Sequence, residues 1–278
     1  FLAQGILYTA IAALIIILLA YLAAIVRSVL KYGDFKVEYN GENIIISHGI
    51  IEKNRISIPT KRIQAIRIEE NLIRSLFGYA TVYIINAGGT TNEGMEGKVI
   101  LFPFIQKERI AKVIHRCLPE YNIDVPFTPV PKRAKAIYML KEALSFFIIV
   151  PVIMACYFLY PWGLLSLLLL PVAMVLGYIR FSYAGWNLSE QQLALRNRLF
   201  TKKTVYFLKS RIQSLEVSRS WWQRRRQLAS LTGTVMSGLL GETGKTAHLD
   251  EMDAQRIYRW FRREKEHPEP EEKKAIIR

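Results

Sequence analysis

The sequence has few of the residues that metal, redox or nucleophilic chemistry requires. Its two cysteines, Cys117 and Cys156, lie far apart, so neither a disulfide framework nor a thiolate metal site can be built from them. The four histidines are scattered, and none has a second histidine, cysteine or carboxylate at metal-ligand spacing. No segment resembles a nucleophile elbow. We therefore expect no catalytic, cofactor-binding or metal-binding residues, and a protein that is not an enzyme.

One segment imitates a nucleotide-binding loop. Residues 238–246 read GLLGETGKT, with one residue more between the first glycine and Gly-Lys-Thr than a P-loop has. The strand-turn-helix context that the motif requires is also missing from the local pattern. We interpret the segment as a glycine-rich hairpin turn without bound nucleotide.

Two long stretches contain no charged side chain. As a helix, residues 7–26 would extend about 30 Å, which matches the hydrocarbon layer of a bilayer. Arg27 and Lys31 follow this run, whereas a secretory signal has its basic residues in front, so we predict a membrane helix. Residues 143–179 form the second stretch, and its interruption at Tyr160-Pro161-Trp162-Gly163 indicates a transmembrane helical hairpin.

The flanking cations predict how these segments are oriented. Lysines and arginines follow the first stretch and flank the second, whereas the tip of the hairpin has none. We therefore expect the polar regions on the cytoplasmic side. The first helix must then enter from the outer face, at an N-terminus that is uncharged and lacks an initiator methionine. This arrangement predicts a fragment, with at least one more membrane helix upstream.

The polar regions contain an internal repeat, which indicates a duplicated unit of membrane segment and polar domain. Residues 62–66, RIQAI, match residues 211–215, RIQSL, and Ile44 and Ile46 match Leu193 and Leu195 at the same separation. Further along, Thr81-Val82 aligns with Thr234-Val235 if the second copy has a four-residue insertion. In residues 238–246, the segment that imitates a P-loop, Gly241, Gly244 and Lys245 match Gly94, Gly97 and Lys98 of the first copy.

Within each copy, apolar and polar residues alternate as in half-buried strands, and one amphipathic helix follows. Glu69 and Glu70 are neighbours in a predicted strand, so they point to opposite faces, and we interpret them as solvated charge rather than as a catalytic pair. Asp250 is the expected N-cap of the second helix. Several antiparallel strands and a closing helix predict a small barrel or sandwich plugged by that helix.

Residues 55–66, RISIPTKRIQAI, and 71–82, NLIRSLFGYATV, resemble the second family of bacterial pleckstrin-homology (PH) domains. The alternation of such domains with membrane helices resembles the YdbT-like multi-pass membrane proteins. The second copy departs from the pattern, because it has WWQRRRQL where the first has the Leu-Phe-Gly-Tyr segment. The resemblance implies PH-like barrels, each closed by a C-terminal helix, without an established reaction or ligand. It also implies a bacterial cytoplasmic (inner) membrane protein.

These observations predict the domain organisation. We expect a transmembrane helix at 1–30, a first PH-like domain at 31–126, a basic, proline-containing linker at 127–142, a transmembrane hairpin at 143–180, a second PH-like domain at 181–264 and an exposed tail at 265–278.

Positive charge is concentrated in the second copy. Residues 32–126 contain 12 basic and 11 acidic residues, a balance of +1, whereas residues 183–262 contain 14 and 6, a balance of +8. Anionic lipid attracts such cations, and tryptophans favour headgroup depth. The alternative is that the tryptophans fill the barrel core and the arginines are simply solvated. The candidate membrane-interface residues are Arg219, Trp221, Trp222, Arg224, Arg225 and Arg226.

The sequence therefore favours a non-enzymatic scaffold whose cytoplasmic PH-like domains bind membrane lipid headgroups or protein partners, with cell-envelope stress or peptide defence as a candidate process. We expect anionic membrane lipids as partners, together with a membrane or cytoplasmic protein or a second copy of the chain. Nucleic-acid binding is not expected, because no DNA or RNA motif accompanies the basic residues. A transporter or membrane enzyme that works through its transmembrane helices is the alternative, and it would need ionisable residues in those helices.

Overall fold

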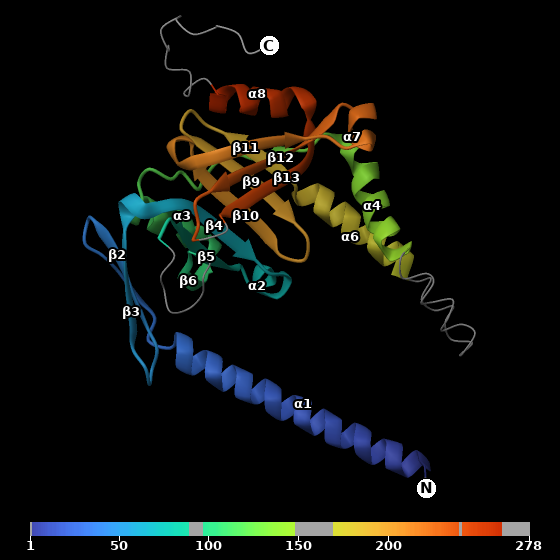
Figure 1. Ribbon diagram of the computed structural model, residues 1–278. Coiled ribbons are helices and arrows are strands. Elements are labelled where there is room, and N and C mark those ends of the chain that lie inside the picture. The colour runs from blue at the N-terminus through green and yellow to red at the C-terminus, as the bar shows by residue number, and fades with distance from the viewer. Residues whose placement is uncertain (1, 89–96, 148–168, 239–240, 263–278) are drawn as a thin grey trace, which may run out of the picture. The chain divides into compact units, whose positions relative to one another are not determined.

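The computed structural model describes residues 2–88, 97–147, 169–238 and 241–262 (Figure 1). The chain divides into two compact units, Phe1–Lys61 and Arg62–Arg278. The division falls inside the first copy of the repeat, so the first three strands of that copy belong to one unit and its remaining strands to the other.

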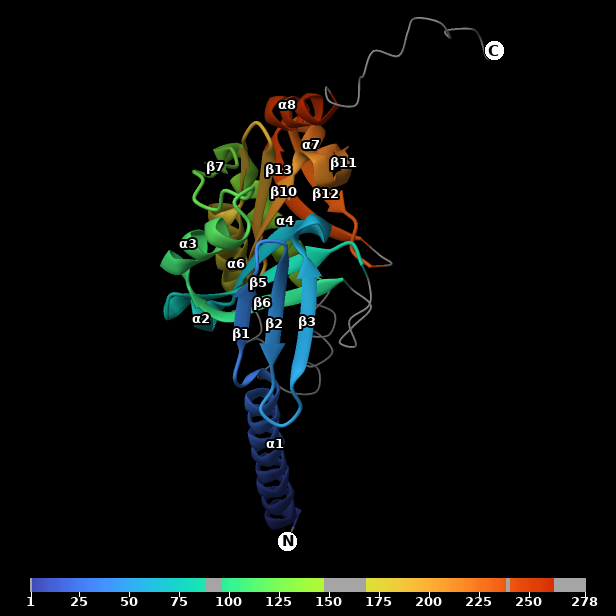
Figure 2. The same ribbon diagram turned by 90° about the vertical axis from the view of Figure 1, so that its left-hand side faces the viewer.

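The first unit joins an apolar helix to a small sheet. Figure 2 shows the three antiparallel strands side by side, in the order β1-β2-β3. The helix is tied to the sheet by backbone hydrogen bonds from Gly49 to Gly33 (2.8 Å) and from Ile50 to Leu30 (3.0 Å). Gly49 has a φ of 108° and lies too close to the Glu52 carbonyl for any side chain. The elements are α1 (Leu2–Tyr32), β1 (Lys36–Tyr39), β2 (Asn43–His48) and β3 (Asn54–Pro59).

Helix α1 has the properties of a membrane span. Its segment Ile11–Tyr32 has a mean hydropathy of 2.6, and 0% of its most apolar window is buried inside the protein. Within the described part of the chain, this is the one helix long and apolar enough to cross a bilayer. The helix predicted at residues 7–26 therefore lies inside α1.

The second unit contains two sheets. The larger has seven strands in the order β6-β5-β4-β10-β9-β8-β7, and the smaller has the order β11-β12-β13. Helix α8 lies across the β11–β13 sheet (Figure 1). The strands are β4 (Ile63–Glu70), β5 (Tyr79–Asn86), β6 (Lys98–Gln106), β7 (Thr128–Pro129), β8 (Gly185–Leu188), β9 (Gln192–Arg198), β10 (Lys202–Leu208), β11 (Ile212–Ser218), β12 (Leu228–Val235) and β13 (Glu242–Asp250).

The two helices predicted to close the copies are present as α3 (Lys107–Cys117) and α8 (Glu251–Arg262). In α3 the buried residues are Ile110, Ile114 and Cys117, which share one face of the helix, as the predicted amphipathic pattern requires. In α8, Ile257 is buried, with Trp260 and Phe261 packed against the same core. The Asp250 side chain accepts a hydrogen bond from the Met252 N–H at 3.1 Å, so the predicted cap is confirmed.

The strand register shows that the repeat is more regular than the sequence suggested. Glu69 pairs with Thr81 in the first copy, and Ser218 pairs with Ser230 in the second. Ser218 follows Glu69 by the same number of residues as Ser230 follows Thr81, so the two strands have no insertion relative to each other. The insertion that we expected before Thr234-Val235 is therefore wrong, because it would shift one strand relative to its partner.

The junction between the copies is a pair of antiparallel strands, β4 from the first copy and β10 from the second. Their pairing makes one continuous sheet and lets Ala65 and Ile85 of the first copy enter the core around Phe207 of the second. Nearly every residue of β4 is buried, in place of the predicted alternation, because the strand lies inside the sheet, between β5 and β10.

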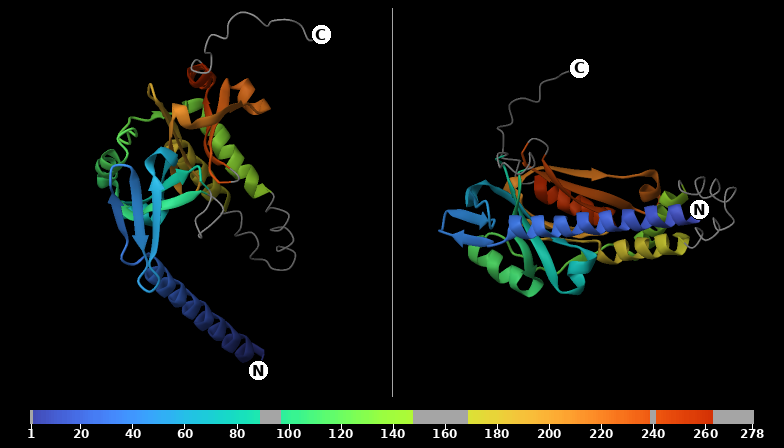
Figure 3. Two further views of the ribbon diagram at one scale, coloured as in Figure 1. Left: turned by 60° about the vertical axis from the view of Figure 1, so that its left-hand side comes forward. Right: turned by 90° about the horizontal axis from the view of Figure 1, so that it is seen from below.

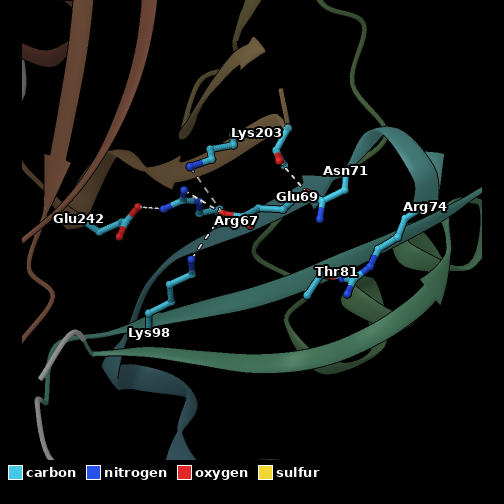
Figure 4. A network of polar contacts seen from close by, with 9 residues as sticks. Arg67, Glu69, Asn71, Arg74, Thr81, Lys98, Lys203 and Glu242 are labelled. Carbon is cyan, nitrogen blue, oxygen red and sulfur yellow. Dashed lines mark hydrogen bonds and ion pairs between the residues drawn. The ribbon is translucent and has the colours of Figure 1, made fainter. Parts of the chain in front are cut away.

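Two carboxylates at this junction carry a network of ion pairs. Glu69 contacts Arg67 at 2.8 Å and Lys98 at 3.4 Å, and Arg67 also contacts Glu242 of β13 (Figure 4). Glu70 contacts Lys107 and Lys202, each at 2.7 Å. The prediction that these glutamates are solvated is therefore wrong, because the pairing of β4 with β10 brings lysines to them and covers them.

The segment after α3 leads into two packed helices, α4 (Lys135–Phe147) and α6 (Leu169–Tyr183), which lie side by side (Figure 3). They approach closely at Gly177, where a Cβ would come within 2.7 Å of the Met139 Cα. Residues 132–134 form a short 3-10 helix, and α4 begins at Lys135, inside the range expected as a linker. The tip of the predicted hairpin lies outside the described residues.

We predict that Glu70→Gln destabilises the second unit by roughly 1–3 kcal/mol at neutral pH, because two lysines lose an ionised partner. Burial raises the pKa of Glu70, but hydrogen bonds and charges from Lys107 and Lys202 oppose it and leave the pKa below its ordinary value of 4.5. The carboxylate therefore stabilises the fold above that value, and its contribution disappears as the pH falls through the folded pKa.

Thermal unfolding of the detergent-solubilised chain, measured from neutral pH down to below the folded pKa of Glu70, would show the effect. Glu216→Gln is the matched control, because Glu216 is an exposed carboxylate on β11. A Glu70→Gln variant as stable as the wild type at pH 7 would contradict the structural role of this ion-pair cluster.

Candidate membrane-interface site

The predicted tryptophan and arginine cluster is built on a short helix, α7 (Trp221–Arg225). Its N-terminus is a capping box, in which Ser220 and Gln223 exchange hydrogen bonds with each other's backbone N–H groups at 3.4 and 2.7 Å. Gln223 points inward, where its amide bonds Ser230 at 2.7 Å and contacts the His248 ring at 2.9 Å. The inward glutamine fixes the helix, and the neighbouring side chains point outward.

Both tryptophans are exposed. The side chains of Trp221 and Trp222 are 56% and 59% exposed, with their rings edge to face at 5.1 Å. The Arg225 guanidinium lies over the Trp221 ring, 4.0 Å from its centroid. Of the two interpretations that the sequence left open, filling of the core by these tryptophans is therefore excluded.

The outer members of the cluster fasten it to neighbouring elements. Arg219 forms an ion pair with Glu251 at the start of α8. Arg226 donates to the Arg133 carbonyl at 3.2 Å, and Arg133 in turn donates to the Gln227 carbonyl at 3.1 Å. Arg133 belongs to the turn that leads directly into α4. The structure therefore brings the six predicted residues together and attaches them to the turn before α4, within the range predicted as the linker.

The equivalent helix of the first copy was missed by the sequence analysis. This helix, α2 (Leu72–Leu76), precedes Gly78 (φ 74°) just as α7 precedes Gln227 (φ 52°). The helix and the residue after it expose apolar side chains, with Leu76 at 85% and Phe77 at 73% exposure. The repeat itself carried the signal, because it aligns Leu72-Ile73 with Trp221-Trp222.

Among the residues that the structure describes, no three or more His, Cys, Asp or Glu side chains gather as metal ligands. The Gly-Lys-Thr of the segment that imitates a P-loop, residues 244–246, lies within strand β13. Gly244 packs against the Phe207 ring, which a Cβ on this glycine would meet at 2.7 Å. An open cavity of about 600 Å³ is lined by Lys209, Arg256 and Arg259, together with the carboxylate of Glu190 and the Trp260 ring, among others.

His248, whose ring contacts Gln223 of α7, makes the stability of the fold depend on pH. Burial, with smaller contributions from the charges of Lys141, Arg180 and Lys245, lowers the pKa of His248 from 6.5 to about 4. Between these values the unfolded chain binds more protons than the folded one, so stability falls as the pH drops. We predict that His248→Asn removes this loss, which amounts to about 3 kcal/mol at most.

Thermal unfolding of wild type and His248→Asn between pH 7 and about pH 4 tests this prediction. Asparagine is the suitable replacement because His248 has a φ of 58°, a conformation that asparagine tolerates. Parallel losses of stability in both proteins would rule out His248 as the source. His115, exposed on α3, provides a control substitution, His115→Asn, that should leave the profile unchanged.

Comparison with known proteins agrees with this architecture. A family model described as the bacterial PH domain matches residues 1–121 and 143–265. The chain is 35% identical over 249 residues to the UPF0699 transmembrane protein YdbT of Bacillus subtilis (strain 168), a match that covers 89% of this chain and 50% of that protein. The chain thus spans about half the length of this relative. Because the family model matches most of its residues, the chain belongs to the bacterial PH domain family.

Proposed function

We propose that this protein is a non-enzymatic scaffold of the bacterial cytoplasmic membrane. In this proposal the chain crosses the membrane through α1 and through a hairpin at residues 143–180, and the PH-like domains at 31–126 and 181–264 lie on the cytoplasmic side. The domains bind anionic lipid headgroups, and a protein partner or a second copy completes the scaffold. The family, the apolar helix α1 and the name of the relative support it. Cell-envelope stress or peptide defence is the process we propose for it.

The observation that carries the proposal is the exposed α7 cluster at the base of α4. Two adjacent indoles exposed to solvent are unfavourable unless a partner covers them. Arg133, through which the cluster is attached, lies in the turn before α4, and α4 leads into the proposed hairpin, so in this proposal the cluster lies on the cytoplasmic side of the segment that enters the membrane. Tryptophan favours headgroup depth, and each nearby arginine gains about 1 kcal/mol from anionic lipid. The cluster therefore has the composition expected of a contact with lipid headgroups.

We predict that Trp221 and Trp222 contact lipid when the full chain is reconstituted into nanodiscs. Lipids brominated near the headgroup end of the acyl chain quench tryptophan emission on contact, so the wild type should lose a larger fraction of its emission than Trp221→Phe/Trp222→Phe. Arg224→Gln/Arg225→Gln should weaken the quenching in discs rich in anionic lipid, because two favourable charges are lost.

A matched control removes the same number of charges elsewhere. Arg256→Gln/Arg259→Gln changes two exposed arginines of α8 and should leave the quenching unchanged. Equal fractional quenching of the wild type and the double phenylalanine variant would refute the lipid contact. If affinity purification after crosslinking then captured a protein through α7, the protein-partner form of the scaffold would replace the lipid form.

A further inference from the structure

A second exposed apolar surface lies around α2, where the two copies meet. Its residues come from three parts of the second unit, namely α2 with the residue after it, strand β6, and the turn between β9 and β10. A soluble surface seldom gathers so many large apolar side chains without a partner. This surface, which we call the α2 patch, consists of Leu72, Ile73, Leu76, Phe77, Phe104, Leu199 and Phe200.

The junction between the copies assembles the α2 patch. Glu70 pairs with Lys202 at the last register position of β4 and β10, and one residue further the side chains of Asn71 and Thr201 are hydrogen bonded at 2.6 Å. The next residues in this antiparallel arrangement are Leu72 and Phe200. The two copies therefore contribute neighbouring parts of one surface, which neither would form alone.

The patch lies beside helix α6. The Arg180 Nε donates to the Arg198 carbonyl at 3.2 Å, at the end of β9 where the turn begins. The Arg198 guanidinium lies over the Tyr183 ring, 4.3 Å from its centroid. Helix α6 also exposes Val172, Val175 and Tyr178.

We propose that the α2 patch inserts into the lipid interface of the membrane that receives α4 and α6. Three features favour lipid over a second copy of the chain. The patch adjoins the C-terminal end of α6, because Leu199 and Phe200 directly follow Arg198, and it combines aliphatic with aromatic residues, as shallow membrane contacts do. Cationic side chains also lie within it and at its edge, because the Arg74 guanidinium lies 4.4 Å from the Phe104 ring centroid and Lys107 bonds Ser75 at 3.0 Å.

The inference rests on the membrane-bound state in the proposed function, but it is independent of lipid binding by α7. It assigns the seven-stranded sheet a contact with the bilayer at α2 in addition to its covalent connection through α6. The second unit is then held at two places and cannot pivot freely about the base of the hairpin.

A spin label at Leu76 in the full chain tests the proposal, with both native cysteines replaced by serine. Leu76 is 85% exposed, so the label should not disturb the fold. In nanodiscs containing anionic lipid, we expect the label to collide more often with oxygen, which partitions into lipid, than with a water-soluble nickel complex. The control label replaces Arg259 on α8, which lies away from α6 in Figures 1 and 3, and should show the opposite preference.

Two results would overturn the proposal. A Leu76 label as accessible to nickel as the Arg259 label would place the patch in water. A label protected from both reagents, with spin–spin coupling that grows when two chains share a disc, would place a second copy on it. Replacing Phe77 and Phe200 by Glu should remove the oxygen preference of a label at Ile73. Tryptophan quenching by brominated lipid, measured on the unlabelled chain, reports on α7, so failure of one contact is distinguishable from failure of the other.

Discussion

The pairing of β4 with β10 is the constraint on which the second unit depends. It joins the second sheet of one copy to the first sheet of the next, so both copies share a seven-stranded sheet and part of one core. Edge strands are available for such pairing because each copy ends its sheets with unpaired backbone groups. The consequence is geometric, since α2, the β9–β10 turn and the base of α6 acquire fixed positions relative to one another.

Charge makes this pairing specific. A one-residue slip would move Lys202 away from Glu70 and turn every side chain of β10 to the other face, so the register is determined by both packing and ion pairs. Buried ion pairs contribute little net stability compared with apolar packing, but an unpaired partner is costly. The network of Arg67, Glu69, Lys98, Lys203 and Glu242 therefore acts chiefly against wrong registers, and it connects three strands of one sheet, β4, β6 and β10, with β13 of the other.

Local patterns in the sequence predicted the elements but not how the copies meet. The apolar run in α1, the amphipathic closing helices and the Asp250 cap follow from periodicity and capping, which act over a few residues. The burial of Glu69 and Glu70 depends on a strand more than a hundred residues away, so no local signal could reveal it. The exposure of Trp221 was equally open, because only the inward direction of Gln223 decides which face of α7 is covered.

The short helices α2 and α7 occupy equivalent positions in the two copies but carry different side chains. Both follow an N-cap residue and end before a residue with positive φ, so their side chains project from equivalent places. Helix α7 presents indoles and arginines, which suit the polar headgroup layer, whereas α2 presents Leu, Ile and Phe, which suit the upper acyl region. A duplicated domain with identical contacts would bind the membrane twice at one depth. The different compositions instead suit two depths, and this difference would set the tilt of the shared sheet relative to the bilayer.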